Sequence, residues 1–320
     1  MEQTKINDQD QKVICISHIK DVDGCVSAAI VKNVTKSRIL LANYGNMNTC
    51  LRRIYDTYVR VYVCDLGINE ATIDEFERIR QFAEITYIDH HDLNRDVLQA
   101  IENLGVQIIH NKLDCAGVLT YNHFKEDLPN EAKLLASYAA VSDRLENGPL
   151  AKKLLRRYSR DFVLFEAMLL SYAIENADSD FKKKLVPKLS KFMYPHQIPG
   201  ISSLALEQIN EEASLRRILP FRIQKMGNVC YVNAKEYSLG MIANLILELS
   251  DAKIGLAYDT NENVQITDIS IRSSHNSKVN LGRKTTKLAK MLGGTGGGHP
   301  KASGARIPAS KLMDFIRGLG

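Results

Sequence analysis

The chain has 320 residues, 45% of them apolar, with 42 Lys and Arg against 37 Asp and Glu. This length predicts about two domains, and the apolar fraction excludes a chain that is disordered throughout. The longest apolar run, residues 163–174, is too short to span a bilayer, and the polar amino terminus lacks the apolar core of a secretion signal. We therefore expect a cytoplasmic protein without membrane spans. Its six scattered cysteines indicate free thiols rather than disulfides or zinc ligands.

The net charge of +5 is divided unevenly along the chain. Residues 271–320 carry ten Lys and Arg and a single acid, so this segment is +9 and the remaining 270 residues total −4. A basic carboxy-terminal part beside an acidic body indicates a polyanionic partner. A solvated basic face without a partner explains the charge alone equally well.

The first 130 residues alternate β-rich runs with helical patterns, which predicts an α/β fold with a parallel, doubly wound sheet. The expected strands are Lys12–Ser17, Arg38–Asn43, Arg60–Cys64, Glu84–Ile88 and Val106–His110, with helices such as Gly24–Val34 and Glu70–Phe82 between them. From residue 130 to 191 the pattern is helical only. We therefore expect a first domain over residues 1–193, with a helical extension after the sheet.

A connection and a second, smaller α/β domain follow. The segment Tyr194–Gly200 holds two prolines and a glycine and predicts the start of a linker over residues 194–220, with a helix at Ser202–Arg217. The expected elements of the domain over residues 221–320 are strand Val229–Asn233, helix Leu239–Leu249, strands Lys253–Tyr258 and Val264–Arg272, helix Leu281–Leu292 and a glycine-rich loop.

Acidic and histidine residues follow three of the expected strands. They are His18, Asp21 and Asp23 after the first strand, Asp65 after the third, and Asp89, His90 and His91 after the fourth. Because the carboxyl ends of parallel strands meet at one edge of an open sheet, we expect these side chains at one site. Each segment alone is more typical of a turn or a helix cap, so the prediction depends on their joint occurrence.

So many neighbouring carboxylates need a compensating positive charge. Mixed carboxylate and imidazole ligands suit manganese, or less selectively magnesium, zinc or iron. Two such ions together can activate a water molecule and stabilise an in-line displacement at phosphorus. The pattern therefore favours a phosphoester hydrolase with a divalent metal centre.

Three segments resemble the first three motifs of the DHH phosphoesterase superfamily, named after the triplet Asp89-His90-His91. They are VICISHIKDVDGCVSAAIV at 13–31, VYVCDLG at 61–67 and YIDHHDL at 87–93. The best match to the fourth motif, an aspartate after a helix, is Asp143. The segment GGTGGGHPKASG at 293–304 resembles the glycine-rich signature of the DHH-associated carboxy-terminal domain, so the resemblance covers nearly the whole chain.

The resemblance implies two divalent ions, manganese or alternatively magnesium, and roles for individual residues. One ion would be held by His18, Asp21 and Asp65, and the other by Asp23, Asp65, His90 and Asp143. His91 would face the scissile phosphate, and Asp89 would orient the histidines. For substrate binding the resemblance implies Arg272, Gly296, Gly297, Gly298, His299 and Gly304.

Physical reasons support part of this substrate assignment. Glycines let backbone N–H groups approach a phosphate closely, and a guanidinium grips phosphate with two hydrogen bonds. A glycine run by itself is also typical of a flexible linker. A further anion site is conceivable at the helix start Asp114–Gly117, although a simple Asp cap explains that segment equally well. The remaining histidines lack motif support and are taken as structural: His110, His123, His196 and His275.

The leading hypothesis is a metal-dependent phosphodiesterase or exonuclease that hydrolyses short single-stranded RNA or DNA to mononucleotides, like a nanoRNase. Aromatic residues make up 7% of the chain and Trp is missing, so few side chains could stack on a long strand. The alternatives are a RecJ-like single-stranded DNA exonuclease in repair, a phosphatase or phosphodiesterase on small nucleotides, and a non-catalytic nucleic-acid-binding protein. The intact acidic and histidine set argues against the last. The resemblance also makes a homodimer an expectation.

Overall fold

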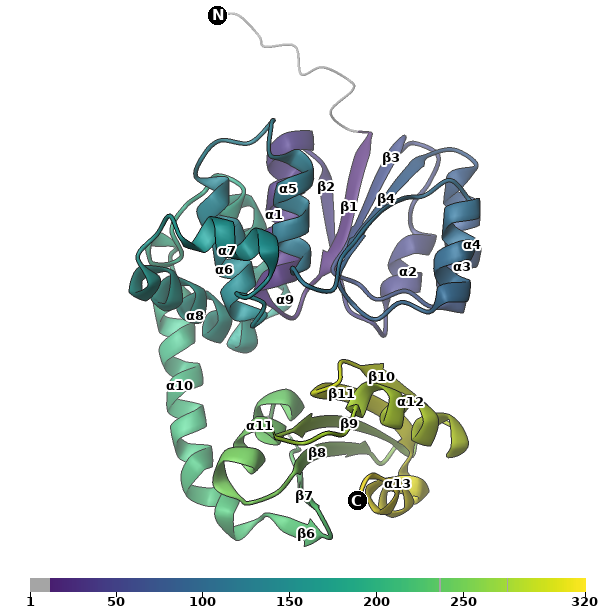
Figure 1. Cartoon of the computed structure of the whole chain (residues 1–320), viewed down its shortest axis with the longest axis vertical. Helices are drawn as coiled ribbons and strands as arrows, with labels where there is room; N and C mark the ends of the chain where they lie inside the picture. Colours follow the sequence, from purple (N-terminus) through teal and green to yellow (C-terminus); the bar gives the residue numbers. More distant parts are fainter. Residues whose placement is uncertain (1–11, 236, 275) are drawn as a thin grey trace, which may run out of the picture. The chain divides into compact units, whose positions relative to one another are not determined.

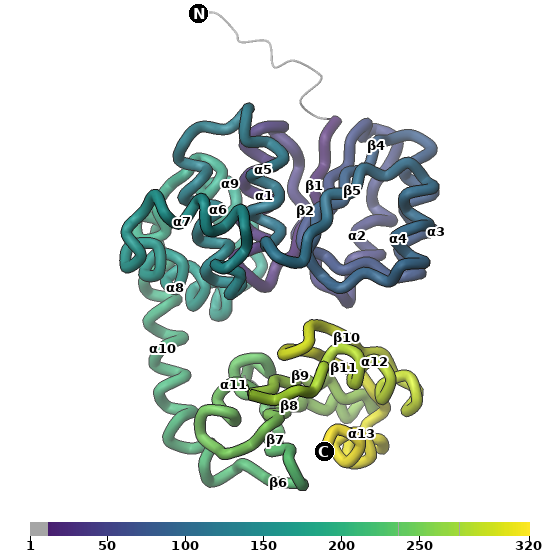
Figure 2. The backbone as a smooth tube through the Cα atoms, viewed as in Figure 1, coloured from purple at the N-terminus to yellow at the C-terminus, as the bar shows by residue number. Residues whose placement is uncertain are grey.

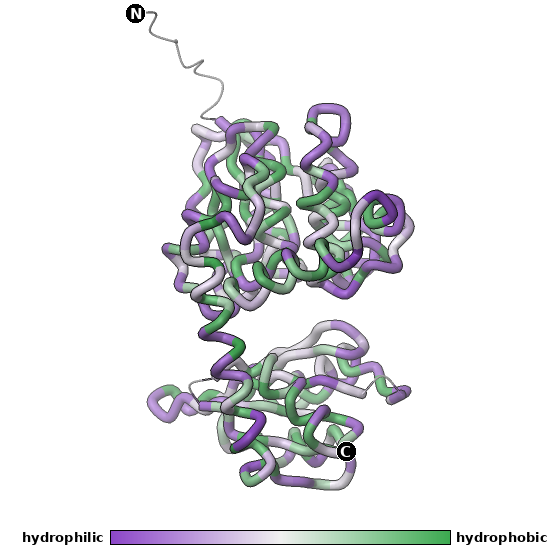
Figure 3. The backbone as a smooth tube through the Cα atoms, turned by 90° about the vertical axis from the view of Figure 1, so that its left-hand side faces the viewer, coloured by the Kyte–Doolittle hydropathy of each residue, from purple (hydrophilic) through white to green (hydrophobic). Residues whose placement is uncertain are grey.

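The structure, a computed structural model, describes residues 12–235, 237–274 and 276–320. Most of the polar amino-terminal segment and His275, both discussed above, lie outside these residues. The chain forms two compact units, the first ending at Ile209 and the second beginning at Asn210. This boundary lies within helix α10 (Ile201–Ile218), along which Figure 3 shows hydrophobic and hydrophilic residues alternating. Of the helices in the described part, none is both long and apolar enough to cross a membrane.

The first unit contains the parallel five-stranded sheet that the sequence predicts (Figure 1). Its strand order is β2-β1-β3-β4-β5, and every neighbouring pair is parallel. The strands are β1 (Val13–His18), β2 (Arg38–Ala42), β3 (Arg60–Cys64), β4 (Glu84–Asp89) and β5 (Gln107–His110). The chain order reverses between β1 and β3, which is the point where open α/β sheets bind ligands outside the strand ends.

Helices cover both faces of this sheet. On one face α1 (Val22–Thr35) and α5 (Ala116–Phe124) contact the sheet. Four further helices pack against these two: α6 (Ala132–Ser142), α7 (Pro149–Leu155), α8 (Arg160–Asn176) and α9 (Ser179–Leu189). The other face carries α2 (Met47–Arg52), α3 (Glu70–Arg80) and α4 (Arg95–Asn103). Figure 2 shows α1 and α5 side by side next to the sheet. Buried on all sides from Val22 to Val31, α1 is the central helix of its layer.

The second unit has a mixed six-stranded sheet with the order β10-β11-β9-β8-β7-β6. Only β7 and β8 are parallel neighbours; the other pairs are antiparallel. The strands are β6 (Gln224–Met226), β7 (Val229–Asn233), β8 (Ile254–Asn261), β9 (Ile266–Ser273), β10 (Thr295–Gly298) and β11 (Ala302–Pro308). Helix α11 (Leu239–Leu249) packs on one face, and α12 (Leu281–Met291) and α13 (Leu312–Leu319) pack on the other. Short 3-10 turns occur at Pro195–Gln197, Leu219–Phe221 and Ala309–Lys311.

The prediction of a glycine-rich loop in this unit is wrong. Thr295–Gly298 is an edge strand, β10, in which Gly297 pairs with Gly304 of β11. The glycines allow this strand to lie directly against α12: a Cβ on Gly296 would lie 3.0 Å from the Thr285 side chain and 3.1 Å from that of Ala289. The physical reason for the run is therefore close strand–helix packing.

Candidate metal centre

The strand register brings the chemically important residues to one edge of the first unit's sheet. Ser17 pairs with Cys64, and Cys64 pairs with Ile88. The residues that follow each of these, His18, Asp65 and Asp89, therefore emerge side by side at the carboxyl end of the sheet. This is the arrangement that the sequence predicts from the parallel topology.

Asp65 lies between two groups of candidate metal ligands. Its Oδ2 is 3.6 Å from Nδ1 of His18, and its Oδ1 is 3.4 Å from Nε2 of His90. The backbone of Asp65 has a φ of 55°, a left-handed conformation that aspartate tolerates better than most residues. Its N–H still donates to the carbonyl of Ile88 at 3.0 Å, so the turn is fixed to the sheet.

The first group consists of His18, Asp21 and Asp65, whose candidate ligand atoms all lie within 4.8 Å of one another. Nδ1 of His18 is 2.8 Å from Oδ2 of Asp21. The other oxygen of Asp21 accepts from the N–H of Gly24 and so caps α1. A Cβ on Gly24 would lie 2.3 Å from the carbonyl oxygen of His18, so only glycine allows α1 to start this close to the end of β1.

The second group consists of Asp23, His90 and Asp143, again within 4.8 Å. Nε2 of His90 is 3.7 Å from Oδ2 of Asp23 and 3.5 Å from Oδ2 of Asp143. Asp143 follows the last turn of α6, so four separate segments contribute to the two groups. The structure thus brings together all six residues for which the sequence suggests a metal-binding role.

Asp23 also occupies the anion position at the start of α5. Its two carboxylate oxygens accept the N–H groups of Ala116 at 2.8 Å and Gly117 at 2.6 Å. Asp114 does not cap this helix; instead its carboxylate accepts from the N–H groups of Leu150 and Ala151 at the start of α7. Both interpretations of the segment Asp114–Gly117 are therefore wrong in detail, because the anion at α5 comes from the chain itself.

Burial and neighbouring charges shift the pKa values of both groups. Burial, together with the charges of Asp21 and Asp23, raises the pKa of Asp65 well above its usual value. Burial and Asp23 do the same for the pKa of Asp143. Burial alone would lower the pKa of His18, but Asp21 and Asp65 raise it to about 10. Oδ2 of Asp65 is buried and has no hydrogen-bond partner in the described part of the chain, as expected for an oxygen that faces a metal ion.

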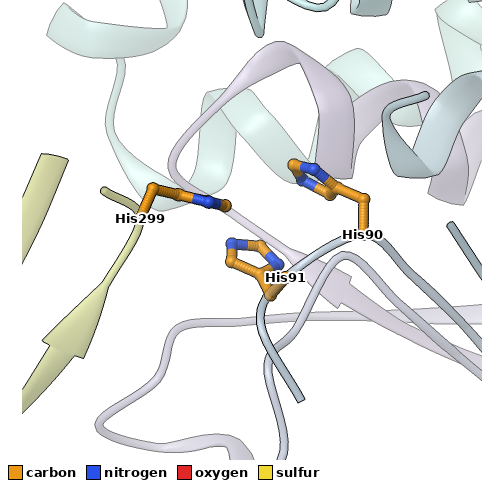
Figure 4. A group of neighbouring side chains, drawn as sticks. All are labelled: His90, His91 and His299. Atoms are coloured by element: carbon orange, nitrogen blue, oxygen red, sulfur yellow. The ribbon is translucent and has the colours of Figure 1, made fainter. Parts of the chain in front are cut away.

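His91 is held by a buried carboxylate next to these groups. Nδ1 of His91 is 2.7 Å from Oδ1 of Asp89, whose other oxygen accepts the hydroxyl of Tyr87 at 2.6 Å. Burial alone would raise the pKa of Asp89, but His91 and Tyr87 lower it to about 2. Figure 4 shows the side chains of His90 and His91 leaving adjacent positions, with ring centroids 4.6 Å apart. Nε2 of His110 fixes this turn further, 2.7 Å from the carbonyl oxygen of His91.

Two tyrosines of the site were not expected from the sequence. Tyr44 follows β2; its hydroxyl is 2.7 Å from Nε2 of His91, and its ring lies 5.0 Å from that of His18. Tyr87 lies on the same side of β4 as Asp89, as the period of two along a strand indicates. Tyr44 carries no such signal, because only the sheet order brings the end of β2 beside that of β1.

In the second unit, the predicted substrate-binding residues lie on three neighbouring strands. Gly296, Gly297 and Gly298 are in β10, His299 follows β10, Gly304 is in β11, and Arg272 is in β9 opposite Ala302. Nη1 of Arg272 donates to Oγ of Ser270 at 3.0 Å and to the carbonyl of Ile271 at 3.1 Å. A Cβ on Gly240 would lie 3.1 Å from Nη2 of Arg272, so the guanidinium lies next to the first turn of α11.

The fold and the site define a two-unit α/β protein with an acidic and histidine cluster at the end of a parallel sheet. Residues 226–319 match the family model described as the DHHA1 domain. Solved structures of DHH proteins share the fold of the whole chain, and with the DHHA1 match they confirm the resemblance to the DHH phosphoesterase superfamily.

Three solved structures illustrate this likeness, each covering 97% of this chain. A DHH-domain protein described as a member of the s1p family of ribosomal proteins has a TM-score of 0.69 and 14% identity over 86% of its chain. RecJ of Thermus thermophilus in complex with Mn²⁺ has a TM-score of 0.64 and 14% identity over 52% of its chain. The pGpG-specific phosphodiesterase PggH of Vibrio cholerae has a TM-score of 0.56 and 13% identity over 97% of its chain.

One curated relative matches part of the chain. It is the uncharacterized protein MJ0831 of Methanocaldococcus jannaschii, 30% identical over 99 residues. The match covers 30% of this chain and 22% of that protein.

Proposed function

We propose that this protein is a metal-dependent phosphodiesterase that releases mononucleotides from short single-stranded oligonucleotides. One observation carries the proposal: Asp65 belongs to the first group of ligand atoms, and its Oδ1 lies 3.4 Å from Nε2 of His90 in the second group, while its buried Oδ2 has no hydrogen-bond partner among the residues described. Neutralising a cluster of this kind is the usual role of divalent cations. The DHHA1 match in the second unit supports the same class of activity.

The residues of the first unit fit a pair of divalent ions. His18, Asp21 and Asp65 would hold one, and Asp23, Asp65, His90 and Asp143 the other, with manganese favoured and magnesium as the alternative. Such ions supply an activated water nucleophile and neutralise charge that develops on the phosphate. RecJ structures with Mn²⁺ support this choice of metal.

The chain's own side chains orient the reaction. Asp89 accepts the Nδ1–H of His91, which leaves Nε2 to hold or donate a proton. The hydroxyl of Tyr44 contacts this nitrogen. When substrate binds, a phosphate oxygen would either replace the hydroxyl next to Nε2 or contact both groups. In the second unit, Arg272, Gly296, Gly297, Gly298, His299 and Gly304 are proposed to bind the nucleotide.

The test is a length series of end-labelled RNA and DNA oligomers, from dinucleotides upward, incubated with the purified protein and Mn²⁺. We expect hydrolysis that requires the metal and that is fastest for about two to five nucleotides. Metal-independent turnover, or none with any phosphodiester, would refute the proposal. Light scattering of the same preparation tests the expected homodimer.

A second candidate is a RecJ-like exonuclease for longer single-stranded DNA. The +9 charge of residues 271–320 favours it, because such a segment attracts a long polyanion. Processive degradation of long DNA in the same length series would replace the first proposal with this one.

A further inference from the structure

We propose that an exposed surface of the first unit, where α7 meets α8, binds single-stranded RNA or DNA outside the metal centre. The surface consists of three arginines and three rings: Arg156, Arg157, Arg160, Phe162, Tyr194 and His196. It would hold the protein on a strand longer than the few nucleotides that the metal centre is proposed to process. The nature of this ligand rests on the proposed function, whereas its binding can be measured without hydrolysis.

The first feature of this surface is positive charge without ion pairs. Residues 152–160 carry five Lys and Arg and no acid, whereas the rest of residues 1–270 totals −9. All five side chains are exposed, and in the described part of the chain none of them forms an ion pair within 4.0 Å or a side-chain hydrogen bond. Lys152 and Lys153 suit the carboxyl end of α7, but Arg160 is the first residue of α8, where the helix dipole disfavours a cation. Because neighbouring like charges repel one another, their accumulation here indicates a polyanionic ligand.

The second feature is a row of exposed rings next to these cations. Phe162 and Tyr194 are 39% and 40% exposed, and their ring centroids lie 5.9 Å apart with an interplanar angle of 83°. The ring of Tyr194 stacks on that of His196, with centroids 5.8 Å apart and an interplanar angle of 13°. Phe165, one turn further along α8, is 63% exposed. Single exposed rings are common, but several side by side indicate an interaction surface.

Tyr158 connects the cations to the rings. It lies in the turn between α7 and α8, directly after Arg157. Burial raises the pKa of Tyr158, the charge of Arg157 opposes this, and that of Tyr194 adds to it, so both side chains lie near this hydroxyl. The arginines and the rings therefore form one continuous surface.

A buried carboxylate fixes the position of His196. Oε2 of Glu166 accepts the backbone N–H of His196 at 3.1 Å, and Oε1 of Glu166 contacts Nδ1 of the same residue. The imidazole nevertheless remains partly exposed. The stack with Tyr194 is thus oriented before a ligand arrives, which lowers the entropy cost of binding.

Cations beside stacked rings match a single-stranded nucleic acid. Guanidinium groups bind backbone phosphates with two hydrogen bonds, and exposed rings stack on bases that a duplex would cover. An acidic peptide would engage the cations without needing the rings.

The surface lies within reach of the metal centre along α7. Asp114, two residues before α5, accepts the N–H groups of Leu150 and Ala151 at the start of α7, and the start of α5 holds Asp23. The seven residues of α7 span about 10 Å. One strand can therefore contact both sites, whereas a dinucleotide at the metal ligands is too short to do so.

Fluorescence anisotropy of end-labelled oligo(U) and oligo(dT), each of about 20 nucleotides, tests the surface with full-length protein in chelator. Replacing the three arginines together by glutamine should weaken binding at least about tenfold and lower the salt slope by about two, since each phosphate contact on a single strand contributes about 0.7. Phe162→Leu with Tyr194→Leu should weaken binding about tenfold without changing the slope. Phe162→Tyr with Tyr194→Phe keeps both rings and should bind like the wild type. The strand that binds more tightly identifies RNA or DNA as the ligand.

The matched control removes three exposed arginines from the opposite helical layer: Arg52→Gln, Arg53→Gln and Arg95→Gln. It should bind like the wild type. An equal loss in this control, unchanged binding after the arginine substitutions, or no binding by the wild type would overturn the surface. Unchanged binding by the double leucine variant, or equal competition by polyglutamate, would refute the assignment to single strands.

Hydrolysis separates this inference from the proposed function. With Mn²⁺, the variant without the three arginines of the surface should hydrolyse a dinucleotide at the wild-type rate. Loss of that turnover would assign these arginines to the reaction and overturn a separate surface. If the wild type hydrolysed no phosphodiester, the proposed function would fail, while anisotropy would still decide whether the surface binds a single strand.

Discussion

Replacing Asp65 by asparagine should stabilise the metal-free protein while it abolishes metal-dependent hydrolysis. Asparagine is preferable to alanine as the substitution, because asparagine tolerates the left-handed backbone at φ 55°, where alanine would add strain. It keeps the shape of the side chain and removes only the charge. The two effects therefore come from the same lost negative charge and not from repacking.

The magnitudes follow from the surroundings of the carboxylate. Burial and the charges of Asp21 and Asp23 oppose its ionisation, and a buried charged group without full compensation costs at least about 1–3 kcal/mol. Removing that cost should raise the Tm of the first unit by roughly 2–12 °C. Loss of the ligand that the two proposed ions would share removes several kcal/mol of charge stabilisation, or about 10³-fold in kcat/KM.

The stability gain depends on pH in a defined direction. The pKa of Asp65 is raised in the folded protein, so its charge opposes folding only where it is ionised. The gain should be complete above the folded-state pKa and should vanish below about pH 4, where the carboxyl is protonated in both states. Denaturant unfolding over this pH range, with chelator-treated protein, measures it.

Asp127→Asn, at an exposed position of the same unit, serves as the control and should change neither stability nor turnover. Wild-type turnover in Asp65→Asn would refute the role of Asp65 in metal binding. A lower free energy of unfolding would show that the carboxylate does not carry an uncompensated charge.

Three further outcomes are expected. Asp23→Asn should destabilise the protein by about 1–3 kcal/mol in denaturant unfolding. Burial raises the pKa of Asp23, but an amide cannot accept both N–H groups at the start of α5, and this loss outweighs the relief of the charge. A gain in stability would contradict this. Tyr44→Phe should lower kcat/KM about tenfold through the lost contact with His91, with little change in Tm; unaltered kinetics would exclude that role. The affinity for Mn²⁺ should fall between about pH 8 and about pH 5, because carboxyl groups with raised pKa values bind protons in competition with the metal. Binding should therefore release protons, which calorimetry in two buffers of different ionisation enthalpy measures. A pH-independent affinity would refute this.

The parallel sheet and the clustering of acidic and histidine residues at its edge could be predicted because each depends on a local pattern. Buried β-rich runs such as Val61–Cys64 alternate with helices, and parallel topology then places their carboxyl ends at one edge. His18 and Asp89 are the last residues of their strands and Asp65 directly follows one, so no tertiary detail was needed to group them.

What could not be predicted depends on contacts between distant segments. The contact of Tyr44 with His91 arises only from the sheet order, which brings the end of β2 beside that of β1. The glycines of β10 illustrate a different limit. Their composition is equally typical of a loop, and only the close approach of α12 explains why a strand forms there.

The five carboxylates of the first unit's site divide according to their hydrogen bonds. Asp21, Asp23 and Asp89 accept from backbone N–H groups, a tyrosine or a histidine, and these contacts fix their orientation without a metal. Asp65 and Asp143 contact the imidazoles of His18 and His90 at distances of 3.4 to 3.6 Å, and in the described structure no backbone N–H group holds their side chains. Burial raises the pKa of Asp65 and Asp143, and also that of Asp23. Each ligand group thus combines a carboxylate that the backbone orients with one that contacts an imidazole. Metal binding should therefore displace protons from these carboxylates, and it should move Asp65 and Asp143 more than the other three.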